Sequence, residues 1–197
     1  MTQVYNYDLV VVGGGPAGSS AAFAAAKNGI KVALIEKENL IAETVRTSGV
    51  TWIKSIEEFG IHENCYHPIK NFSFASPNNE VTISDSIATA AVLDVRKTYR
   101  WISEEAKKLG VDIFVKTNIN DVIKDEEQNI IGVKGTRAEE IITFNSKVVI
   151  DATGFTSTIS KTMGYVTQWE RFGAGAEYEA EVENADPDTW WLMVGQE

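Results

Sequence analysis

Residues 8–22 read Asp8-Leu9-Val10-Val11-Val12-Gly13-Gly14-Gly15-Pro16-Ala17-Gly18-Ser19-Ser20-Ala21-Ala22, and residues 31–36 read Lys31-Val32-Ala33-Leu34-Ile35-Glu36. The apolar runs predict buried parallel strands over 8–13 and 31–36, and the Ala-rich stretch between them predicts a helix over 16–28, closed by Gly29. A strand, a glycine-rich turn, a helix and a second strand form one βαβ unit. The pattern indicates the α/β class.

The turn has the spacing G-x-G-x-x-G. Gly13 permits the tight turn after the strand, Gly15 lets a pyrophosphate approach the backbone, and Gly18 lets the helix lie close to the sheet. The amino end of the helix offers free N–H groups and a positive dipole end to phosphates. Glu36, at the end of the second strand, can accept hydrogen bonds from ribose hydroxyls, and an acid there argues against NADP. The alternative is an ordinary βαβ unit with a solvent-facing Glu36.

Composition excludes several classes of protein. The chain has 197 residues and a net charge of −10, and no cluster of Lys or Arg offsets that charge, which argues against a nucleic-acid partner. A single cysteine, Cys65, rules out an internal disulfide framework and fits a reducing compartment. Neither a signal peptide nor a membrane span is visible. We expect a cytoplasmic protein, with peripheral membrane contact left open.

The middle of the chain predicts a loop over 39–50 and a short helix over 51–59, capped by Thr51 and ended by Gly60. Two alternating stretches, 72–74 and 81–83, predict a hairpin around residues 77–79. A longer helix should open at residues 93–96 and run to about Leu109. Its apolar face is predicted to comprise Tyr99, Ile102, Ala106 and Leu109.

The second half predicts a different connection from that of a plain Rossmann unit. A strand over 111–115 is followed by short strands near 119–124, 130–135 and 140–145, which form a β-meander where a crossover helix would stand. Another buried strand, 147–151, runs into Ala152-Thr153-Gly154. The meander argues against a plain NAD dehydrogenase, which uses helical crossovers.

This order of elements resembles the FAD-binding domain of the two-dinucleotide-binding-domain flavoproteins. Within that superfamily, the chain resembles the geranylgeranyl reductase family over roughly residues 5–182. The resemblance is carried by Tyr7-Asp8, the 13–22 turn, Val32–Lys37, Val92-Leu93-Asp94-Val95-Arg96 and Val149-Ile150-Asp151-Ala152-Thr153-Gly154. It implies an α/β, Rossmann-like FAD-binding domain of the glutathione-reductase type, with a β-meander and the start of an antiparallel substrate-domain sheet.

The same resemblance assigns a set of cofactor-binding residues. The diphosphate would lie against the first turn, the adenosine ribose against Glu36, and adenine against the backbone of Ile119. Arg46 would face the diphosphate or the flavin ring, or else be a surface arginine, and Arg96 would reach the cofactor, or else lie on a helix surface. Asp151 is expected to brace its turn rather than take part in chemistry. The whole set is Gly13, Gly15, Pro16, Ala17, Gly18, Glu36, Lys37, Arg46, Thr47, Ser48, Gly49, Arg96, Ile119, Thr153 and Gly154.

The chain departs from the family pattern in one stretch that could take part in the reaction. Many geranylgeranyl reductases carry a Cys-Gly-Glu-Gly-like stretch where this chain reads Arg46-Thr47-Ser48-Gly49, so a thiol near the flavin is in doubt. Cys65 is interpreted as a small, partly buried hydrophobic residue. His62, Cys65 and His67 lack a fourth ligand for zinc, so no metal site is predicted. No residue is a convincing proton donor, and the catalytic residues stay unknown.

The second flavin motif of the family, Gly-Asp-Ala, is absent. We expect an FAD-binding domain over 1–165, with a hairpin insertion at about 68–92, and over 166–197 the beginning of a substrate-binding sheet. Its expected strands, 172–182 and Trp190–Val194, have no predicted partners. The polypeptide is therefore interpreted as the N-terminal part of a longer flavoprotein, or as a truncated product.

The predicted function is that of the FAD-binding part of an oxidoreductase. Such an enzyme would reduce isoprenoid double bonds by hydride transfer from reduced FAD. A small molecule or an isoprenoid lipid would be the substrate, and the electron donor, NAD(P)H or ferredoxin, is not fixed by the sequence. Two alternatives are a flavin monooxygenase or halogenase of the same fold, and a truncated non-catalytic nucleotide-binding domain.

Overall fold

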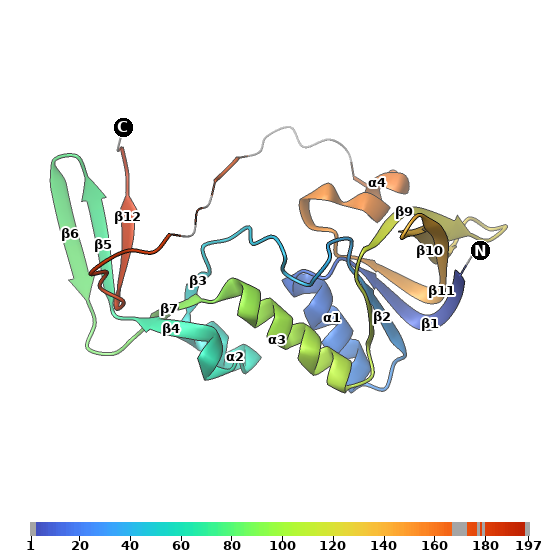
Figure 1. Ribbon diagram of the computed structural model, residues 1–197, viewed down its shortest axis with the longest axis horizontal. Helices are drawn as coiled ribbons and strands as arrows, with labels where there is room; N and C mark the ends of the chain where they lie inside the picture. The colour runs from blue at the N-terminus through green and yellow to red at the C-terminus, as the bar shows by residue number, and fades with distance from the viewer. Residues whose placement is uncertain (1–2, 167–172, 177, 179, 196–197) are drawn as a thin grey trace. The chain divides into compact units, whose positions relative to one another are not determined.

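The computed structural model describes residues 3–166, 173–176, 178 and 180–195. Its residues form two compact units, and each is described by itself (Figure 1). The first unit comprises residues 1–44 and 99–173, and the second comprises residues 45–98 and 174–197.

The first unit is built on a six-stranded sheet with the order β8-β2-β1-β11-β10-β9. Strands β1 (Gln3–Val12), β2 (Val32–Ile35), β8 (Asp112–Phe114) and β11 (Glu140–Asp151) run parallel. Strands β9 (Thr117–Lys124) and β10 (Ile130–Arg137) join β11 in an antiparallel meander. The expected Rossmann-like fold with a β-meander is confirmed.

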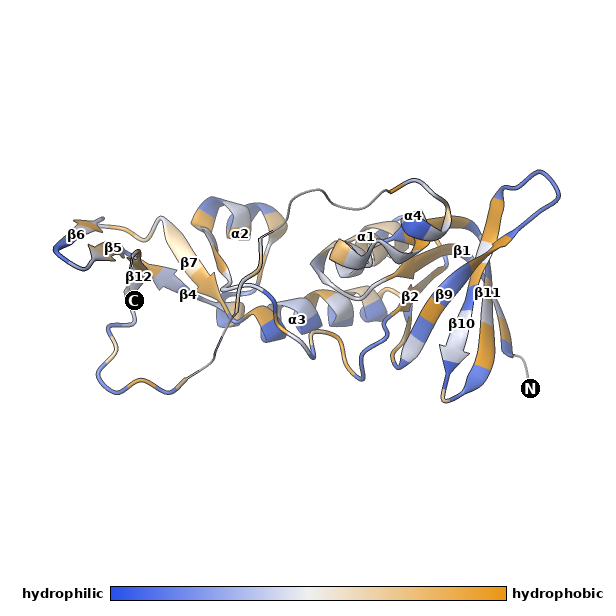
Figure 2. Cartoon of the chain, turned by 90° about the horizontal axis from the view of Figure 1, so that it is seen from above, coloured by the Kyte–Doolittle hydropathy of each residue, from blue (hydrophilic) through white to orange (hydrophobic). Residues whose placement is uncertain are grey.

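The centre of this sheet, formed by β2 and residues 9–12 of β1, is buried on both faces. On β1, Leu9 and Val11 pack with Ala22 of α1 (Pro16–Lys27) and Ala106 of α3 (Val95–Lys108). Val10 and Val12 pack on the opposite face, together with Phe114, Phe144 and Ile159. Successive side chains of a strand point to opposite faces, so an unbroken apolar run fits a strand that is covered on both sides. Figure 2 shows apolar segments along β1 and β2.

The closing part of the sheet differs from the sequence-based expectation. Stretches 140–145 and 147–151 were expected as separate strands, but they form the single strand β11. This strand pairs antiparallel with β10 through its first half and parallel with β1 over most of its length, so two sets of hydrogen bonds keep it extended. Its second half is not fully buried, since Val148 is 55% exposed.

Helix α3 begins later than expected, at Val95, because Leu93 belongs to strand β7 (Ala90–Leu93). The Asp94 carboxylate accepts a hydrogen bond from the backbone N–H of Lys97 at 2.9 Å and so caps the first turn. The expected apolar face is wrong at Leu109, which lies beyond the helix and is 46% exposed.

The second unit contains two three-stranded sheets. One has the order β3-β7-β4, with β3 (Val50–Trp52) and β4 (Tyr66–Ile69) each pairing antiparallel with β7. Helix α2 (Ile53–Phe59) follows β3, the short 3-10 turn η1 (Glu63–Cys65) precedes β4, and Gly60 ends α2 in the left-handed region, as expected. Thr51 does not cap α2, because it lies in β3 opposite Ala91 and Trp52 takes the cap position.

The other sheet has the order β12-β5-β6, with β5 (Asn71–Ser76), β6 (Asn79–Ser84) and β12 (Thr189–Met193). The predicted hairpin is confirmed, with Ser76 opposite Asn79 across the turn. The expectation that the Trp190–Val194 tail has no partner is wrong. β12 pairs parallel, not antiparallel, with β5, and the Trp190 ring makes edge contacts with Phe72 and Phe74.

The expected strand over 172–182 is not formed by its described residues, 173–176, 178 and 180–182, while 172, 177 and 179 lie outside the described part. The short turn η2 (Gly154–Thr156) and helix α4 (Thr158–Thr162) follow β11 in the first unit. In the described part of the chain, none of the helices has the length and apolar character needed to cross a membrane.

Candidate functional site

The turn after β1 has the tight geometry that its glycines predict. Gly13 has φ +109° and donates its N–H to the Ile35 carbonyl at 2.8 Å. A Cβ on Gly13 would lie 2.2 Å from the Ala152 carbonyl oxygen, and one on Gly18 would lie 1.8 Å from the Gly13 carbonyl oxygen. Gly13 is therefore needed for close packing of this turn against the end of β11. Gly18 is needed for close packing of α1 against the turn.

Gly15 has a different role, because its surroundings are empty. It is the N-cap of α1 with φ −69°, and a Cβ placed on it would meet no atom within 4 Å. Pro16 and Ala17, which follow it, are exposed, and the first turn of α1 holds no acidic residue. The amino end of α1 thus faces open space with its unpaired N–H groups and positive dipole end available to an anion.

Glu36 is held beside this turn by two backbone N–H groups. Its Oε2 accepts from Gly14 at 2.7 Å and its Oε1 accepts from Glu38 at 2.9 Å. Each carboxylate oxygen keeps a second lone pair for a hydroxyl donor. The side chain is half-buried, and the neighbouring Lys37 is exposed.

The start of β9 lies next to Glu36. The Thr117 N–H donates to the Glu36 carbonyl at 3.0 Å, and Ile119 follows two residues later on the same edge strand. The Ile119 side chain is buried in the core, opposite Gly135 at an irregularity in the β9–β10 register. Only the main chain of Ile119 is therefore available to a ligand.

The turn after β11 lies against the first glycine turn. The Ala152 N–H donates to the Val12 carbonyl at 2.8 Å, and the Thr153 nitrogen is 3.0 Å from the position of a Cβ on Gly13. Gly154 has φ +65°, and a Cβ there would meet nothing within 4 Å. Two backbone turns, one after β1 and one after β11, thus meet at the same edge of the sheet, where ligands of doubly wound folds bind.

Asp151 braces this second turn, as expected. Its Oδ1 accepts from the N–H and the hydroxyl of Thr153 at 3.1 and 2.6 Å, and its Oδ2 accepts from the N–H and the hydroxyl of Ser160, both at 2.8 Å. Partial burial would raise the pKa of Asp151, but the hydrogen bonds from Thr153 and Ser160 outweigh it and lower that pKa.

The remaining predicted residues belong to the second unit. Arg46, Thr47 and Ser48 are exposed, whereas Gly49 is buried with φ +78°. A Cβ on Gly49 would lie 2.6 Å from the Leu93 carbonyl oxygen, and the Leu93 N–H donates to the Gly49 carbonyl at 2.9 Å.

The structure thus brings the 46–49 loop to the start of α3, where the half-buried Arg96 lies in the first turn. This neighbourhood belongs to the second unit.

Sequence reasoning missed two residues of the first-unit site. No role was predicted for Gly14, yet its N–H donates to Glu36, and a Cβ on it would lie 2.3 Å from the Ile41 side chain. Ala152 was seen only as part of a motif, yet its carbonyl oxygen fills the space beside Gly13. The sequence signal that could have identified Gly14 is the additional glycine between Gly13 and Gly15. No signal in the sequence distinguishes Ala152.

His62 and Cys65 both form hydrogen bonds with Asn64, whereas His67 lies beside Asp188. The His62 ring nitrogen accepts from the Asn64 N–H at 3.2 Å, the Cys65 thiol donates to the Asn64 side chain at 3.3 Å, and the His67 ring lies 3.3 Å from the Asp188 carboxylate. Cys65 is buried, and burial raises the pKa of its thiol. Cys65 was interpreted as a small, partly buried residue, and the structure buries it almost completely.

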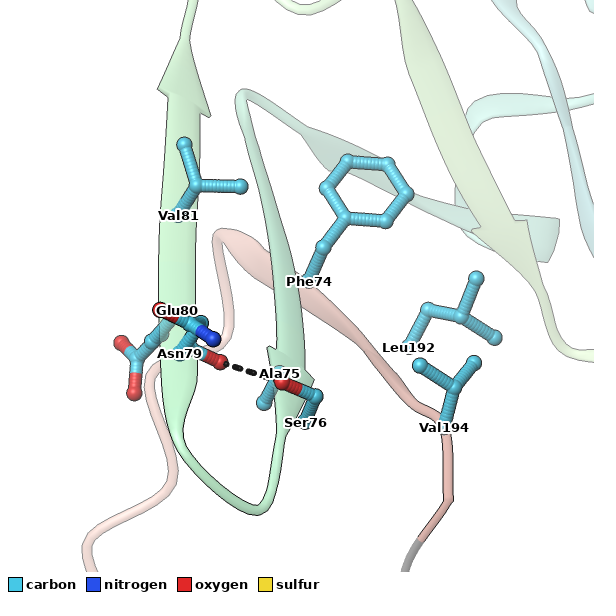
Figure 3. A pocket seen from close by; sticks show the side chains of 8 residues that line it. All are labelled: Phe74, Ala75, Ser76, Asn79, Glu80, Val81, Leu192 and Val194. Carbon is cyan, nitrogen blue, oxygen red and sulfur yellow. Dashed lines mark hydrogen bonds between the residues drawn. The ribbon is translucent and has the colours of Figure 1, made fainter.

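A shallow pocket of about 440 Å³ lies on the β12–β5–β6 sheet. In Figure 3, Phe74, Leu192 and Val194 lie on the same side of this sheet, while Ser76, Asn79 and Glu80 lie at the hairpin end. None of the predicted cofactor-binding residues lines it.

The sequence matches known flavin enzymes. A family model described as FAD dependent oxidoreductase matches residues 8–170. A digeranylgeranylglycerophospholipid reductase of Methanocaldococcus jannaschii is 35% identical over 198 residues, covering 97% of this chain and 50% of the relative. The protein of the same name from Methanococcus vannielii is 35% identical over 163 residues, covering 81% of this chain and 41% of the relative.

Solved structures agree with these sequence matches. A geranylgeranyl bacteriochlorophyll reductase-like protein of Thermoplasma acidophilum superposes with a TM-score of 0.78 at 26% identity, over 98% of this chain and 51% of its own. The flavin-dependent brominase Bmp2 superposes with a TM-score of 0.65 at 27% identity, over 81% of this chain and 41% of its own. The chain spans about half the length of the curated relatives that it matches.

Proposed function

Because this chain belongs to the FAD-dependent oxidoreductase family, we propose that its two glycine turns and Glu36 bind the ADP part of FAD. Gly13, Gly15, Pro16, Ala17 and Gly18 form the diphosphate side of this site. Glu36 is the ribose acceptor, beside Lys37. Ile119 supplies main-chain groups to the adenine, and Thr153 and Gly154 border the diphosphate.

The empty space at Gly15 carries this proposal. This space lies at the amino end of α1, and a Cβ placed on Gly15 would have nothing within 4 Å. The first turn of α1 has no acidic residue that would repel an anion there. Helix amino ends with glycine turns bind phosphates through backbone N–H groups, so the donor set fits a diphosphate. Glu36 fits the ribose because its two oxygens are fixed and each keeps a free lone pair.

The resemblance further assigns Arg46, Thr47, Ser48, Gly49 and Arg96 to the cofactor. An arginine can pair with diphosphate oxygens through a planar pair of donors, which supports Arg46 and Arg96 in such a role. The packing of Gly49 against Leu93 supports a fixed loop at the start of α3.

The activity of the whole protein is proposed to be reduction of isoprenoid double bonds. Bound FAD supplies hydride transfer, and the protein supplies position and a water-poor pocket. The names of the curated relatives support a lipid with geranylgeranyl chains as substrate. Exposed apolar side chains on the β12–β5–β6 sheet, including Phe74, Val81 and Leu192, would suit such a hydrocarbon. A cytoplasmic location with peripheral membrane contact fits this substrate.

The domain organisation is proposed on the same grounds. Residues 1–165 would form the FAD-binding domain with an insertion at about 68–92, and residues 166–197 would begin the substrate-binding sheet. The pairing of β12 with β5 supports a common sheet for the insertion and the tail.

Titration of the purified chain with FAD tests the cofactor proposal. Absorbance near 450 nm after removal of free FAD, and quenching of flavin fluorescence, measure binding (oxidised flavins absorb at about that wavelength). We expect Gly15→Val to lose FAD binding while the chain stays folded, because the added methyl groups enter open space rather than protein.

Gly175→Val is the matched control. A Cβ on Gly175 also meets nothing within 4 Å, and this residue lies outside the proposed site. We expect it to bind FAD like the unmodified chain. A Gly15→Val chain that binds FAD as tightly as this control would show that the diphosphate does not lie at α1.

The brominase similarity favours one alternative, a flavin-dependent halogenase or monooxygenase. NADPH oxidation by the whole protein, with and without a geranylgeranyl lipid, separates the reductase from the halogenase or monooxygenase. Lipid-dependent oxidation with a saturated product supports the reductase, whereas oxygen consumption with a halogenated or hydroxylated product supports the alternative. A chain that binds no FAD would instead support a non-catalytic module.

A further inference from the structure

Asp151 has an unusually complete set of hydrogen-bond donors. Its two oxygens accept four hydrogen bonds, two from Thr153 and two from Ser160, between 2.6 and 3.1 Å. An ionised carboxylate has about four lone-pair positions, so all of them are used. No position is left for a substrate proton or a metal ion, and Asp151 is therefore a brace.

The brace acts on the backbone that touches the phosphate turn. The same Thr153 nitrogen that donates to Asp151 lies 3.0 Å from the Cβ position of Gly13. Ala152, between Asp151 and Thr153, contacts both ends of the first turn. Its carbonyl oxygen lies 2.2 Å from the Cβ position of Gly13, and its Cβ lies 3.1 Å from that of Gly18.

The brace also extends to the chain that follows. The Thr153 hydroxyl, which donates to Asp151, accepts from the Thr158 N–H at 2.8 Å. The Ser157 N–H donates to the Gly154 carbonyl at 3.0 Å, and the Ser160 N–H donates to Asp151. Residues 153–160 are thus folded around one carboxylate.

We propose that Asp151 is a positioning residue for the cofactor diphosphate, acting through Ala152 and Thr153 on the turn formed by Gly13–Gly18. This inference rests on the proposed FAD site, and it adds a residue that makes no contact with the cofactor. The lowered pKa of Asp151 agrees with it, because partial burial is outweighed by the donors and the carboxylate stays ionised at neutral pH.

Asp151→Asn tests the inference with little change in shape. An amide offers one oxygen, so its NH₂ group must face either Thr153 or Ser160. A hydroxyl can rotate to accept from that group, but a backbone N–H cannot, so one N–H loses its acceptor. The turn then loses its fixed position.

The experiment compares FAD affinity and the ³¹P NMR signals of bound FAD in the purified chain. We expect Asp151→Asn to weaken FAD binding about tenfold, the scale of one lost charged hydrogen bond. We also expect its two diphosphate signals, recorded at FAD saturation, to shift. Circular dichroism at the titration temperature establishes that both chains are folded.

Asp125→Asn is the matched control. Asp125 also braces a turn, accepting from the N–H and the side-chain amide of Asn129 at 2.8 and 3.0 Å, but that turn joins β9 and β10. We expect this variant to keep the affinity and the ³¹P signals of the unmodified chain. A carboxylate that only stabilises the fold would change unfolding in both variants and leave the ³¹P signals in place.

The outcomes separate this inference from the function it rests on. If the unmodified chain binds no FAD, or if Gly15→Val binds it normally, the proposed FAD site fails. If those two results are as expected but Asp151→Asn keeps unshifted ³¹P signals, whatever its affinity, the positioning role of Asp151 is overturned. Shifted signals with weakened binding support it.

Discussion

Glu36 combines two tasks in one carboxylate: it holds the Gly14 N–H and the Glu38 N–H, and it is the proposed acceptor for the ribose. We expect Glu36→Ala to weaken FAD binding by about 1–3 kcal/mol, the scale of lost hydrogen bonds to a charged group. A simple affinity measurement would not separate the two tasks, because the turn itself loses an acceptor.

A pair of ligands separates the two tasks of Glu36. The unmodified chain should bind ADP more tightly than 2′-deoxy-ADP, and in Glu36→Ala this preference should disappear. Isothermal titration calorimetry measures both ligands. Equal weakening of both ligands, with the preference retained, would show that Glu36 only shapes the turn.

Gly18 is the residue of the turn at which a side chain should be most harmful to folding. The Cβ of Gly18→Ala would lie 1.8 Å from the Gly13 carbonyl oxygen, so α1 must move away from the turn. We expect a loss of about 3 kcal/mol or more in the free energy of unfolding, measured by urea denaturation. Gly15→Ala, in the same turn but facing open space, should lose less than about 1 kcal/mol. Similar losses in both variants would contradict the close packing.

At the level of elements, the connection from β11 to α4 depends on the ionised form of Asp151. Its pKa in the folded chain is lower than the ordinary value of 3.8, so folding favours the charged carboxylate. The resulting stability is present above the pKa of the unfolded chain and is lost as the pH falls through the lower folded pKa.

The lowered pKa of Asp151 gives a prediction for the stability of Asp151→Asn. The variant should be less stable than the unmodified chain at neutral pH, and the difference should shrink as the pH falls below the ordinary value of 3.8 and through the lower pKa of the folded chain. Urea denaturation at several pH values measures it. A difference that stays constant with pH would mean that the charge of Asp151 contributes nothing.

At the scale of the whole molecule, the two units differ in how well they cover their apolar residues. The six-stranded sheet of the first unit has a core on both faces. The β12–β5–β6 sheet of the second unit leaves Val81 57% exposed and Val194 54% exposed, and Leu192 is also exposed. Exposed apolar sheet surfaces favour association between chains.

We therefore expect the double variant Val81→Lys, Leu192→Lys to associate less at high concentration than the unmodified chain. Sedimentation velocity measures association. Binding of FAD should be unchanged, since neither residue belongs to the proposed site. If association is the same in both chains, the exposed sheet face is not its cause.

The sequence by itself determined the first βαβ unit, the meander and the roles of Gly13 and Gly18. These follow from local rules: an apolar run long enough for a buried strand, a glycine where a Cβ would clash, and short strands in succession at the meander. The hairpin and the end of α2 at Gly60 were also predictable, because turn residues act on their immediate neighbours.

Only the tertiary structure decided which distant segments meet. It paired β12 with β5, joined residues 140–151 into one strand between two partners, and moved Thr51 from a helix cap into β3. It also set Ala152 against Gly13 and gave the Asp151 carboxylate its four donors. Such pairings depend on backbone hydrogen bonds and close packing between residues far apart in the chain, and composition and periodicity carry no record of those contacts.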